Sequence, residues 1–316
     1  MDFAERQACN RWASAALIFI FCAFFLLVGL LVDHLYLDAF AANGPPLPLA
    51  TIVSLSIAAL IALGSYYQGS RWILTSLGAE SLDRELPEHR ELHNVVTEMA
   101  LASGSPMPKV YVVFDPAPNA FATGRDESNA SVCVTTGLLA LLNREETQGV
   151  IAHEIAHIRN RDILLAMLVS VLLGGVVLLS DWAQRSFYST RSRHKLRSGA
   201  ALLIIPAFLL IVFAPLISRL LAMAVSRQRE YLADAAAAEF TRNPLGLARA
   251  LEKIRDASMP FHKATRGTAH LFFVNPLRRR VDDREGKLAD LLSTHPPISR
   301  RIALLQRMAG VFPAPR

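Results

Sequence analysis

Two histidines stand at a spacing that can bind a single metal ion. His153 and His157 occur in the sequence His-Glu-Ile-Ala-His, with Glu154 directly after the first. On a helix, residues four apart lie on one face, so both imidazoles can reach one cation. Zinc accepts neutral imidazole nitrogens, and in catalytic sites it keeps one position for water. The spacing therefore predicts a site for one Zn²⁺ per chain, with Glu154 beside it but outside the ligand set.

A catalytic zinc site needs a third protein ligand, and Glu230 is the best candidate. The Ala-rich segment from Met223 to Phe240 is predicted to be helical, and Asp234 follows Glu230 by four residues. We expect Glu230 to bind zinc and Asp234 to accept a hydrogen bond from the second nitrogen of a ligand histidine. The alternative is an acidic pair on a solvated helix, with Arg227 and Arg229 as its partners.

Such a site has the chemistry of a zinc hydrolase. Bound zinc lowers the pKa of water to around 7 and polarises a scissile carbonyl. Glu154 would take the proton of that water and pass it to the leaving amine. The tetrahedral oxyanion formed during this reaction would need a further hydrogen-bond donor.

The elements that must position these residues are helices and a small sheet. Asn143 and Glu146 form a capping-box pattern, which predicts a helix from Arg144 through His157 that could continue into an apolar run. A further helix is predicted at Leu92–Ala102, strands at Lys109–Phe114, Asn119–Thr123 and Ser131–Thr135, and the start of helical structure at Gly137–Leu142. The polar part of the chain is thus predicted to be α+β.

Composition indicates that the chain also enters lipid. Of its 316 residues 52% are hydrophobic and only 19% are charged, against about 25% in soluble domains. This composition excludes a disordered chain, and three cysteines at wide spacing exclude a disulfide scaffold. Four uncharged apolar runs approach the length of a membrane helix, namely Ala13–Val32, Leu47–Tyr67, Ile163–Ser180 and Gly199–Ser218. We therefore divide the chain into a membrane hairpin (1–67), a first catalytic part (68–162), a second apolar hairpin (163–218) and a second catalytic part (219–316).

The charges beside these runs predict an orientation. Arg6, Arg11 and Arg71 flank the first two runs, whereas the connection from Asp33 to Pro46 has no Lys or Arg. Positive residues stay in the cytoplasm, so this connection is expected outside and both polar parts inside. The basic connection from Asp181 to Ser198 conflicts with two full crossings by the later runs. Either these runs form a hairpin that does not cross fully, or another constraint decides.

The net charge of +6 suits contact with the cytoplasmic face of a lipid bilayer. Basic residues are not interleaved with an aromatic platform, so no nucleic-acid partner is expected.

Six separated blocks of the chain resemble the HtpX-type membrane metalloproteases, which are relatives of the CAAX prenyl endopeptidases. The blocks are Pro118–Arg125, Val134–Leu139, His153–Asp162, Ser226–Glu239, Ala269–Leu277 and Ser293–Leu305. The resemblance implies a zincin-like (gluzincin) α+β catalytic domain combined with about four helical membrane segments. It implies zinc on His153, His157 and Glu230, with Glu154 as the catalytic base. It also implies a multi-pass endopeptidase of the bacterial inner membrane that faces the cytoplasm and degrades unfolded or damaged membrane proteins.

The resemblance implies further site residues. An extended piece is expected to pair with substrate backbone, and it consists of Asn119, Ala120, Phe121, Ala122, Thr123 and Gly124. His295 and Arg301 match positions near the cleft, where they could stabilise the oxyanion. A capping or core role for His295, and a solvated helix face for Arg301, are the alternatives. A cleft that reads backbone would also permit self-cleavage once detergent replaces the membrane.

Three other functions compete with this interpretation. An intramembrane protease is disfavoured, because charged residues flank the histidines on both sides and would be costly at bilayer depth. A membrane scaffold with a structural zinc would leave Glu154 without a task, and such sites are usually closed Cys/His sites. A CAAX-type prenyl-protein endopeptidase shares the motifs, but four apolar runs in 316 residues match the compact bacterial form better.

Overall fold

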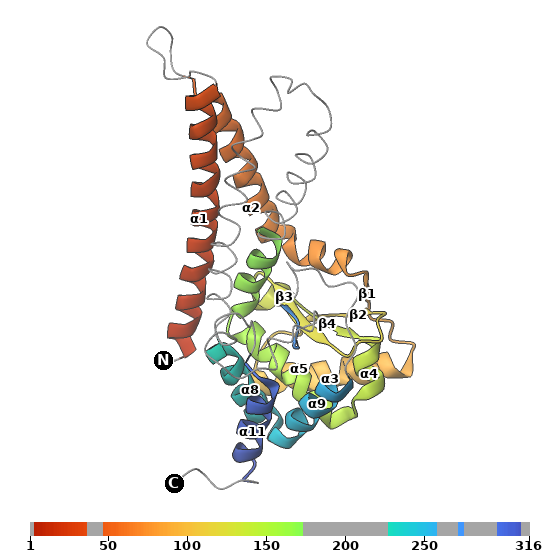
Figure 1. Ribbon diagram of the computed structural model, residues 1–316. Coiled ribbons are helices and arrows are strands. Elements are labelled where there is room, and N and C mark those ends of the chain that lie inside the picture. Colours follow the sequence, from red (N-terminus) through yellow and green to blue (C-terminus); the bar gives the residue numbers. More distant parts are fainter. Residues whose placement is uncertain (1–2, 37–46, 173–226, 258–270, 275–295, 311–316) are drawn as a thin grey trace, which may run out of the picture.

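The computed structural model describes residues 3–36, 47–172, 227–257, 271–274 and 296–310 (Figure 1). The helices are α1 (Phe3–Tyr36), α2 (Leu49–Ser76), α3 (Pro87–Ser103), α4 (Thr136–Leu141), α5 (Arg144–Arg159), α8 (Arg227–Thr241), α9 (Pro244–Ala257) and α11 (Ile298–Met308). The strands are β1 (Ala79–Ser81), β2 (Lys109–Val113), β3 (Ala120–Gly124) and β4 (Ala130–Thr135). Residues 162–172 are also helical.

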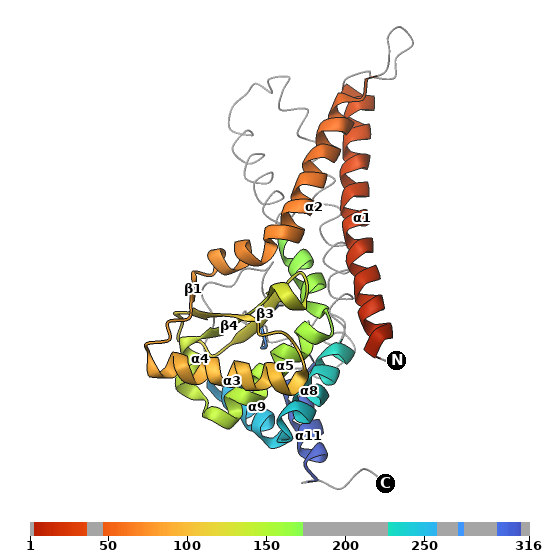
Figure 2. The same cartoon turned by 180° about the vertical axis from the view of Figure 1, so that it is seen from behind.

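Helices α1 and α2 lie side by side and extend well beyond the sheet and the other described helices (Figures 1 and 2). Each contains a candidate membrane span of 28 residues, with mean hydropathies of 3.1 and 2.0. The helices touch at Gly29, where a Cβ atom would overlap Thr51 and Ser54. At the far end of α1, the Asp33 carboxylate accepts the N–H groups of Ala50 and Thr51 at 2.9 and 2.8 Å. These contacts satisfy donors at the start of α2 that have no partner within the helix.

The first two predicted apolar runs are therefore confirmed as long helices. Of the third run only the part up to Leu172 is described, and it is helical. Its residues Leu168 and Leu172 pack with Phe21 of α1 and Ala58 of α2. The rest of the third run and the whole fourth run lie outside the described residues.

The sheet has the strand order β1-β2-β4-β3. Strands β2 and β4 are parallel, and the other two pairs are antiparallel. The small sheet expected from the sequence is thus present and mixed, with the short strand β1 as an addition. Strand β3 lies at one edge of the sheet.

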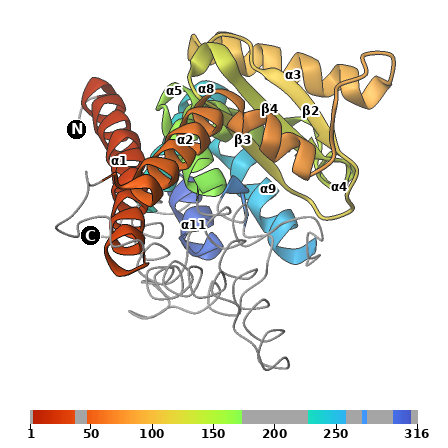
Figure 3. The ribbon, with the colours of Figure 1, turned by 90° about the horizontal axis from the view of Figure 1, so that it is seen from above.

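Two apolar clusters hold the sheet between layers of helix (Figures 1 and 3). On one face, Val112, Ala122 and Val132 pack with helices α3, α5 and α9. On the other face, Phe121 and Cys133 pack with the last turns of α2. Helices α5 and α9 meet closely at Gly149, where an added Cβ atom would lie only 2.7 Å from the backbone nitrogen of Leu247.

The predicted helix carrying the histidines is α5, and its capping box is confirmed. Asn143 accepts the N–H of Glu146 at 3.0 Å, and the Glu146 side chain accepts the N–H of Asn143 at 2.9 Å. The helix does not continue into the third apolar run. It ends at Asn160, and Arg161 has a φ of 58°, so a left-handed residue turns the chain before the next helix starts.

Candidate metal centre and active site

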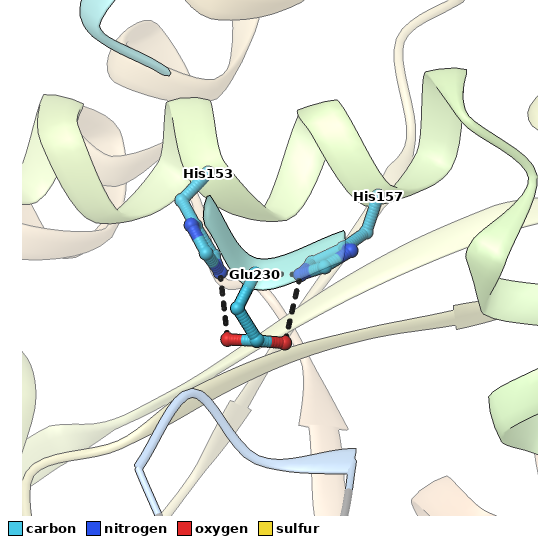
Figure 4. Close-up of side chains that lie close together, drawn as sticks. All are labelled: His153, His157 and Glu230. Atoms are coloured by element: carbon cyan, nitrogen blue, oxygen red, sulfur yellow. Dashed lines mark hydrogen bonds and ion pairs between the residues drawn. The ribbon is translucent and has the colours of Figure 1, made fainter. Parts of the chain in front are cut away.

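His153 and His157 project from α5 toward Glu230 of α8 (Figure 4). The Nε2 atoms of the two histidines are 3.1 Å apart. Oε2 of Glu230 lies 3.7 Å from Nε2 of His153, and Oε1 lies 3.6 Å from Nε2 of His157. The site thus combines one helical turn of α5 with a carboxylate more than 70 residues further along the chain.

This donor set fits a zinc ion. One ligand atom from each of the three side chains lies within 4.8 Å of the other two. Zinc bonds to nitrogen and oxygen measure about 2.0–2.2 Å, so donors separated by 3–4 Å can bind one ion together. Two imidazoles and one carboxylate also match the ligand types that catalytic zinc uses when a fourth position is kept for water.

Each histidine has a second carboxylate partner behind it. Nδ1 of His153 lies 2.9 Å from Oδ1 of Asp234, and Nδ1 of His157 lies 3.1 Å from Oδ2 of Asp162. A carboxylate that accepts from Nδ1–H leaves the lone pair of Nε2 free for a metal. Both histidines therefore present Nε2 to the same point.

Arg301 of α11 holds Asp234 in place. Its Nε and Nη2 donate to the two carboxylate oxygens of Asp234 at 2.8 and 2.7 Å, and Nη1 lies 3.4 Å from Oε2 of Glu230. The Arg301 side chain is 1% exposed, and its guanidinium stacks 4.9 Å from the ring centre of Phe273. Arg301 is not among the described residues that line the cavity at the histidines.

Burial and these charges shift the pKa values of the site. Burial lowers the pKa of His153 to about 4. Burial alone would also lower the pKa of His157, but the hydrogen bond to Asp162 and the charge of Glu230 outweigh it and raise the pKa to about 9. Burial opposes ionisation of Asp234, yet the charge of Arg301 keeps its pKa below the usual value.

Glu154 lines the same small cavity as the three candidate ligands. Its side chain is almost fully buried, and burial raises its pKa to about 7, against the effect of the nearby His157 charge. A general base works best when its pKa lies near the operating pH. The cavity continues along an apolar wall formed by residues such as Leu165, Val169 and Phe272.

The piece predicted to bind substrate is strand β3, preceded by Asn119. Ala122 lines the cavity, and all five residues of β3 are buried. The outer edge of the strand is partly covered by the chain itself, because the N–H of Phe273 donates to the carbonyl of Ala120 at 2.8 Å. The side chain of Asn119 pairs with the backbone of Val274 at 2.8 and 3.2 Å.

The structure thus brings most of the sequence-predicted site residues together. His153, Glu154, His157, Glu230 and Ala122 line one cavity, with Asp234 and Arg301 packed behind it. His295 lies outside the described residues. Sequence reasoning overlooked Asp162, although it closes the block that contains both histidines, and Phe273, whose ring centre is 4.9 Å from that of His153.

Comparison with protein families gives a match to the model "Peptidase family M48" over residues 87–309. The match spans every residue discussed at the candidate metal centre, from Asn119 to Arg301.

Curated relatives carry the name "Protease HtpX homolog". One from Caldanaerobacter subterraneus subsp. tengcongensis is 47% identical over 248 residues, covering 77% of this chain and 80% of the relative. Another from Streptococcus gordonii is 37% identical over 310 residues, covering 96% of this chain and 99% of the relative. A third from Pyrococcus abyssi is 44% identical over 260 residues, covering 82% and 86%. Among solved structures, Ste24p of S. mikatae aligns with a TM-score of 0.49 at 18% identity, over 96% of this chain and 67% of that one.

Proposed function

Because this chain belongs to peptidase family M48 and is a membrane-associated metalloprotease, we propose that it uses one zinc ion to cut misfolded or damaged membrane proteins at the cytoplasmic face of the bacterial inner membrane. The observation that carries the proposal is the convergence of His153, His157 and Glu230, with Glu154 in the same cavity. The family match and the HtpX homologues confirm, at the level of the family, the resemblance seen in the sequence.

In this proposal each residue of the site has one task. His153, His157 and Glu230 hold the zinc ion, which when bound supplies Lewis acidity for water and for the scissile carbonyl. Glu154 takes a proton from the attacking water and delivers it to the leaving nitrogen. Asp234 fixes the ring of His153, and Arg301 fixes Asp234 by a bidentate pair.

Arg301 acts as a positioning residue in this scheme, instead of the oxyanion donor expected from the sequence. Its donors are directed to the Asp234 and Glu230 carboxylates and to the carbonyl of Phe273, and it is buried behind the ligands. The oxyanion role of His295 stays a prediction.

The substrate is proposed to bind in an extended form along strand β3. Strand β3 lies at the edge of the sheet, and Phe273 already donates to its Ala120 carbonyl, so the part of the edge proposed for the substrate is the one near Ala122, which lines the cavity. An added strand would be held there by backbone hydrogen bonds. Such binding depends on the substrate's backbone more than on its side chains, which suits unfolded substrates of many kinds. It also permits the enzyme to cut its own loops in detergent.

The site's position supports action at the membrane. The helical residues 162–172 follow α5 and pack against α1 and α2 (Figure 1). Leu165 and Val169 of this helix also line the cavity, so the cavity borders the helix that contacts both apolar helices. The positive residues Arg6, Arg11 and Arg71 favour a cytoplasmic location for the cavity.

The test uses the full-length protein in detergent or in bilayer discs. Zinc content is measured together with cleavage of an unfolded membrane protein and of a prenylated peptide, with and without a chelator. We expect about one zinc per chain and chelator-sensitive cleavage of the unfolded protein. Preference for the prenylated peptide would contradict the substrate assignment, and cleavage that survives complete metal removal would contradict the zinc mechanism.

A further inference from the structure

We propose that Asn10, in the first membrane helix, is a positioning residue for the metal ligand His157 and acts through Asp162. The inference rests on the proposed function, since it concerns the same metal site. It assigns to the membrane anchor a part in building that site, beyond holding the enzyme at the bilayer.

Asp162 is the link between the two residues. Its Oδ2 lies 3.1 Å from Nδ1 of His157, and its Oδ1 lies 2.5 Å from Nδ2 of Asn10. Asp162 is only 6% exposed, so both oxygens depend on protein partners more than on water. The orientation of this carboxylate sets the orientation of the His157 ring, and hence the direction of Nε2.

The amide of Asn10 is suited to hold that carboxylate. A primary amide has two N–H donors, and the second is directed at the carbonyl of Asn160, 3.0 Å from Nδ2. Asn160 ends α5, and Asp162 begins the next helix after the left-handed Arg161. The side chain of Asn10 therefore binds both sides of the turn that carries Asp162.

Two neighbouring side chains of α1 make hydrogen bonds that do not involve Asp162. Gln7, one turn before Asn10, donates to the carbonyl of Arg159 at 2.8 Å, and Ser14 donates to the carbonyl of Asn10 at 2.9 Å. Asn10 is 9% exposed and Ser14 is 3% exposed. Arg229 also approaches this carboxylate but is further away than Asn10, with its Nη1 3.8 Å from Oδ1. Asn10 is thus the nearer partner of that oxygen.

The physical consequence is a dependence of metal affinity on a residue of α1. Partners that orient a ligand histidine change metal affinity by about 10–100-fold when removed. Asn10 contacts Asp162 and not the histidine itself, so we expect loss of the Asn10 side chain to weaken metal binding by about tenfold, at the lower end of that range.

The experiment uses the full chain in bilayer discs, with Glu154→Gln as the common background so that self-cleavage does not interfere. Co²⁺ is the probe, because its visible spectrum reports coordination geometry and its dissociation constant can be measured by chelator competition. Asn10→Ala should weaken Co²⁺ binding about tenfold and change the spectrum. The double variant Asn10→Ala/Asp162→Ala should bind Co²⁺ as Asp162→Ala does, because the two residues act in series.

Two matched controls separate positioning from general damage to the anchor. Gln7→Ala removes a contact of α1 with the end of α5, and Ser54→Ala removes the 3.0 Å hydrogen bond from Ser54 to the Phe25 carbonyl between α1 and α2. Both should keep the dissociation constant within about twofold of the background, since neither side chain contacts Asp162 directly. Asn10→Asp keeps the shape but turns an acceptor toward Asp162, and it should weaken binding at least as much as Asn10→Ala.

The proposal is overturned if Asn10→Ala binds Co²⁺ within twofold of the background, if a control loses as much affinity, or if the effects of Asn10→Ala and Asp162→Ala simply add. The proposed protease function is judged separately, by cleavage in the wild-type background. An intact Asn10 effect on Co²⁺ in a chain that cuts no protein would support this inference and contradict only the function.

Discussion

Arg301 and Asp234 form a bidentate ion pair, with donor–acceptor distances of 2.8 and 2.7 Å, behind the candidate metal centre. The same carboxylate lies 2.9 Å from Nδ1 of His153. A guanidinium on α11 therefore sets the position of a carboxylate on α8, which in turn sets a ring on α5. Three helices that are distant in sequence are joined at one buried point.

Removal of the guanidinium should destabilise the whole catalytic domain. Arg301→Ala leaves the Asp234 carboxylate buried without its main partner, and the loss of one member of a buried ion pair costs about 3–5 kcal/mol in the free energy of unfolding. Arg300→Ala is the matched control, because Arg300 is exposed on the same helix and should change that energy by less than about 0.5 kcal/mol. Urea unfolding in detergent measures both. If Arg301→Ala and Arg300→Ala changed the free energy of unfolding equally, the Arg301–Asp234 pair would not be important for stability.

Replacement of Glu154, the proposed general base, should remove cleavage while the metal stays bound. Glu154→Gln keeps the shape of the side chain but cannot accept the proton, so we expect kcat to fall by about 10²–10⁴-fold. Zinc content by mass spectrometry should match that of the wild type. Glu145→Gln provides the control, since Glu145 lies on the exposed side of α5 and pairs with Arg249 at 2.7 Å. If Glu154→Gln still cleaves at the wild-type rate, the catalytic assignment is wrong.

The carboxylate of α8 should be required for metal binding itself. Glu230→Gln replaces an anionic ligand by a neutral amide. Loss of a residue that orients a ligand histidine lowers metal affinity by about 10–100-fold, and we expect the loss of zinc affinity in Glu230→Gln to be larger. Glu239→Gln, at an exposed position on the same helix, should bind zinc like the wild type. Chelator competition measures the two constants. Full retention of zinc by Glu230→Gln would exclude Glu230 as a ligand.

Metal affinity should rise with pH through the neutral range. The pKa of His157 is about 9 without a bound cation, because the Asp162 hydrogen bond and the Glu230 charge outweigh its burial. Zinc binds the neutral ring, so at pH 7 binding must release this proton. Apparent affinity is then expected to increase by about tenfold per pH unit between pH 7 and 8 and to level off above about pH 9.

The Asp162→Asn variant checks the origin of this pH dependence. An amide cannot offer the charge that stabilises the His157 cation, so the rise in affinity should shift to lower pH. Titration calorimetry in buffers of different ionisation enthalpy counts the proton released. A pH-independent zinc affinity in the wild type between pH 7 and 9 would contradict the charged state of His157.

The local features of this protein follow from sequence alone. His153 and His157 share a helix face because they are four residues apart, and the Asn143–Glu146 capping box marks where that helix begins. The two long apolar helices, which are candidate membrane spans, follow from the length of their apolar runs. Strands β2, β3 and β4 begin and end within one residue of the predicted segments, because β-branched residues mark β2 and β4 in the chain and prolines precede β2 and β3.

Only the tertiary structure decides which distant groups meet. From the sequence, Asp234 was expected to support a ligand histidine without a choice between the two, and packing of α8 on α5 assigns it to His153 and Asp162 to His157. Arg301 reaches Asp234 across 67 residues of sequence, and Asn10 reaches Asp162 across 152. Spacing along a helix encodes contacts within about one turn, whereas these contacts depend on how separate helices pack, and no local pattern records that. The sequence by itself determined the local geometry of the proposed metal ligands and the two long apolar helices, and the packing of the helices decided what holds each proposed ligand in place.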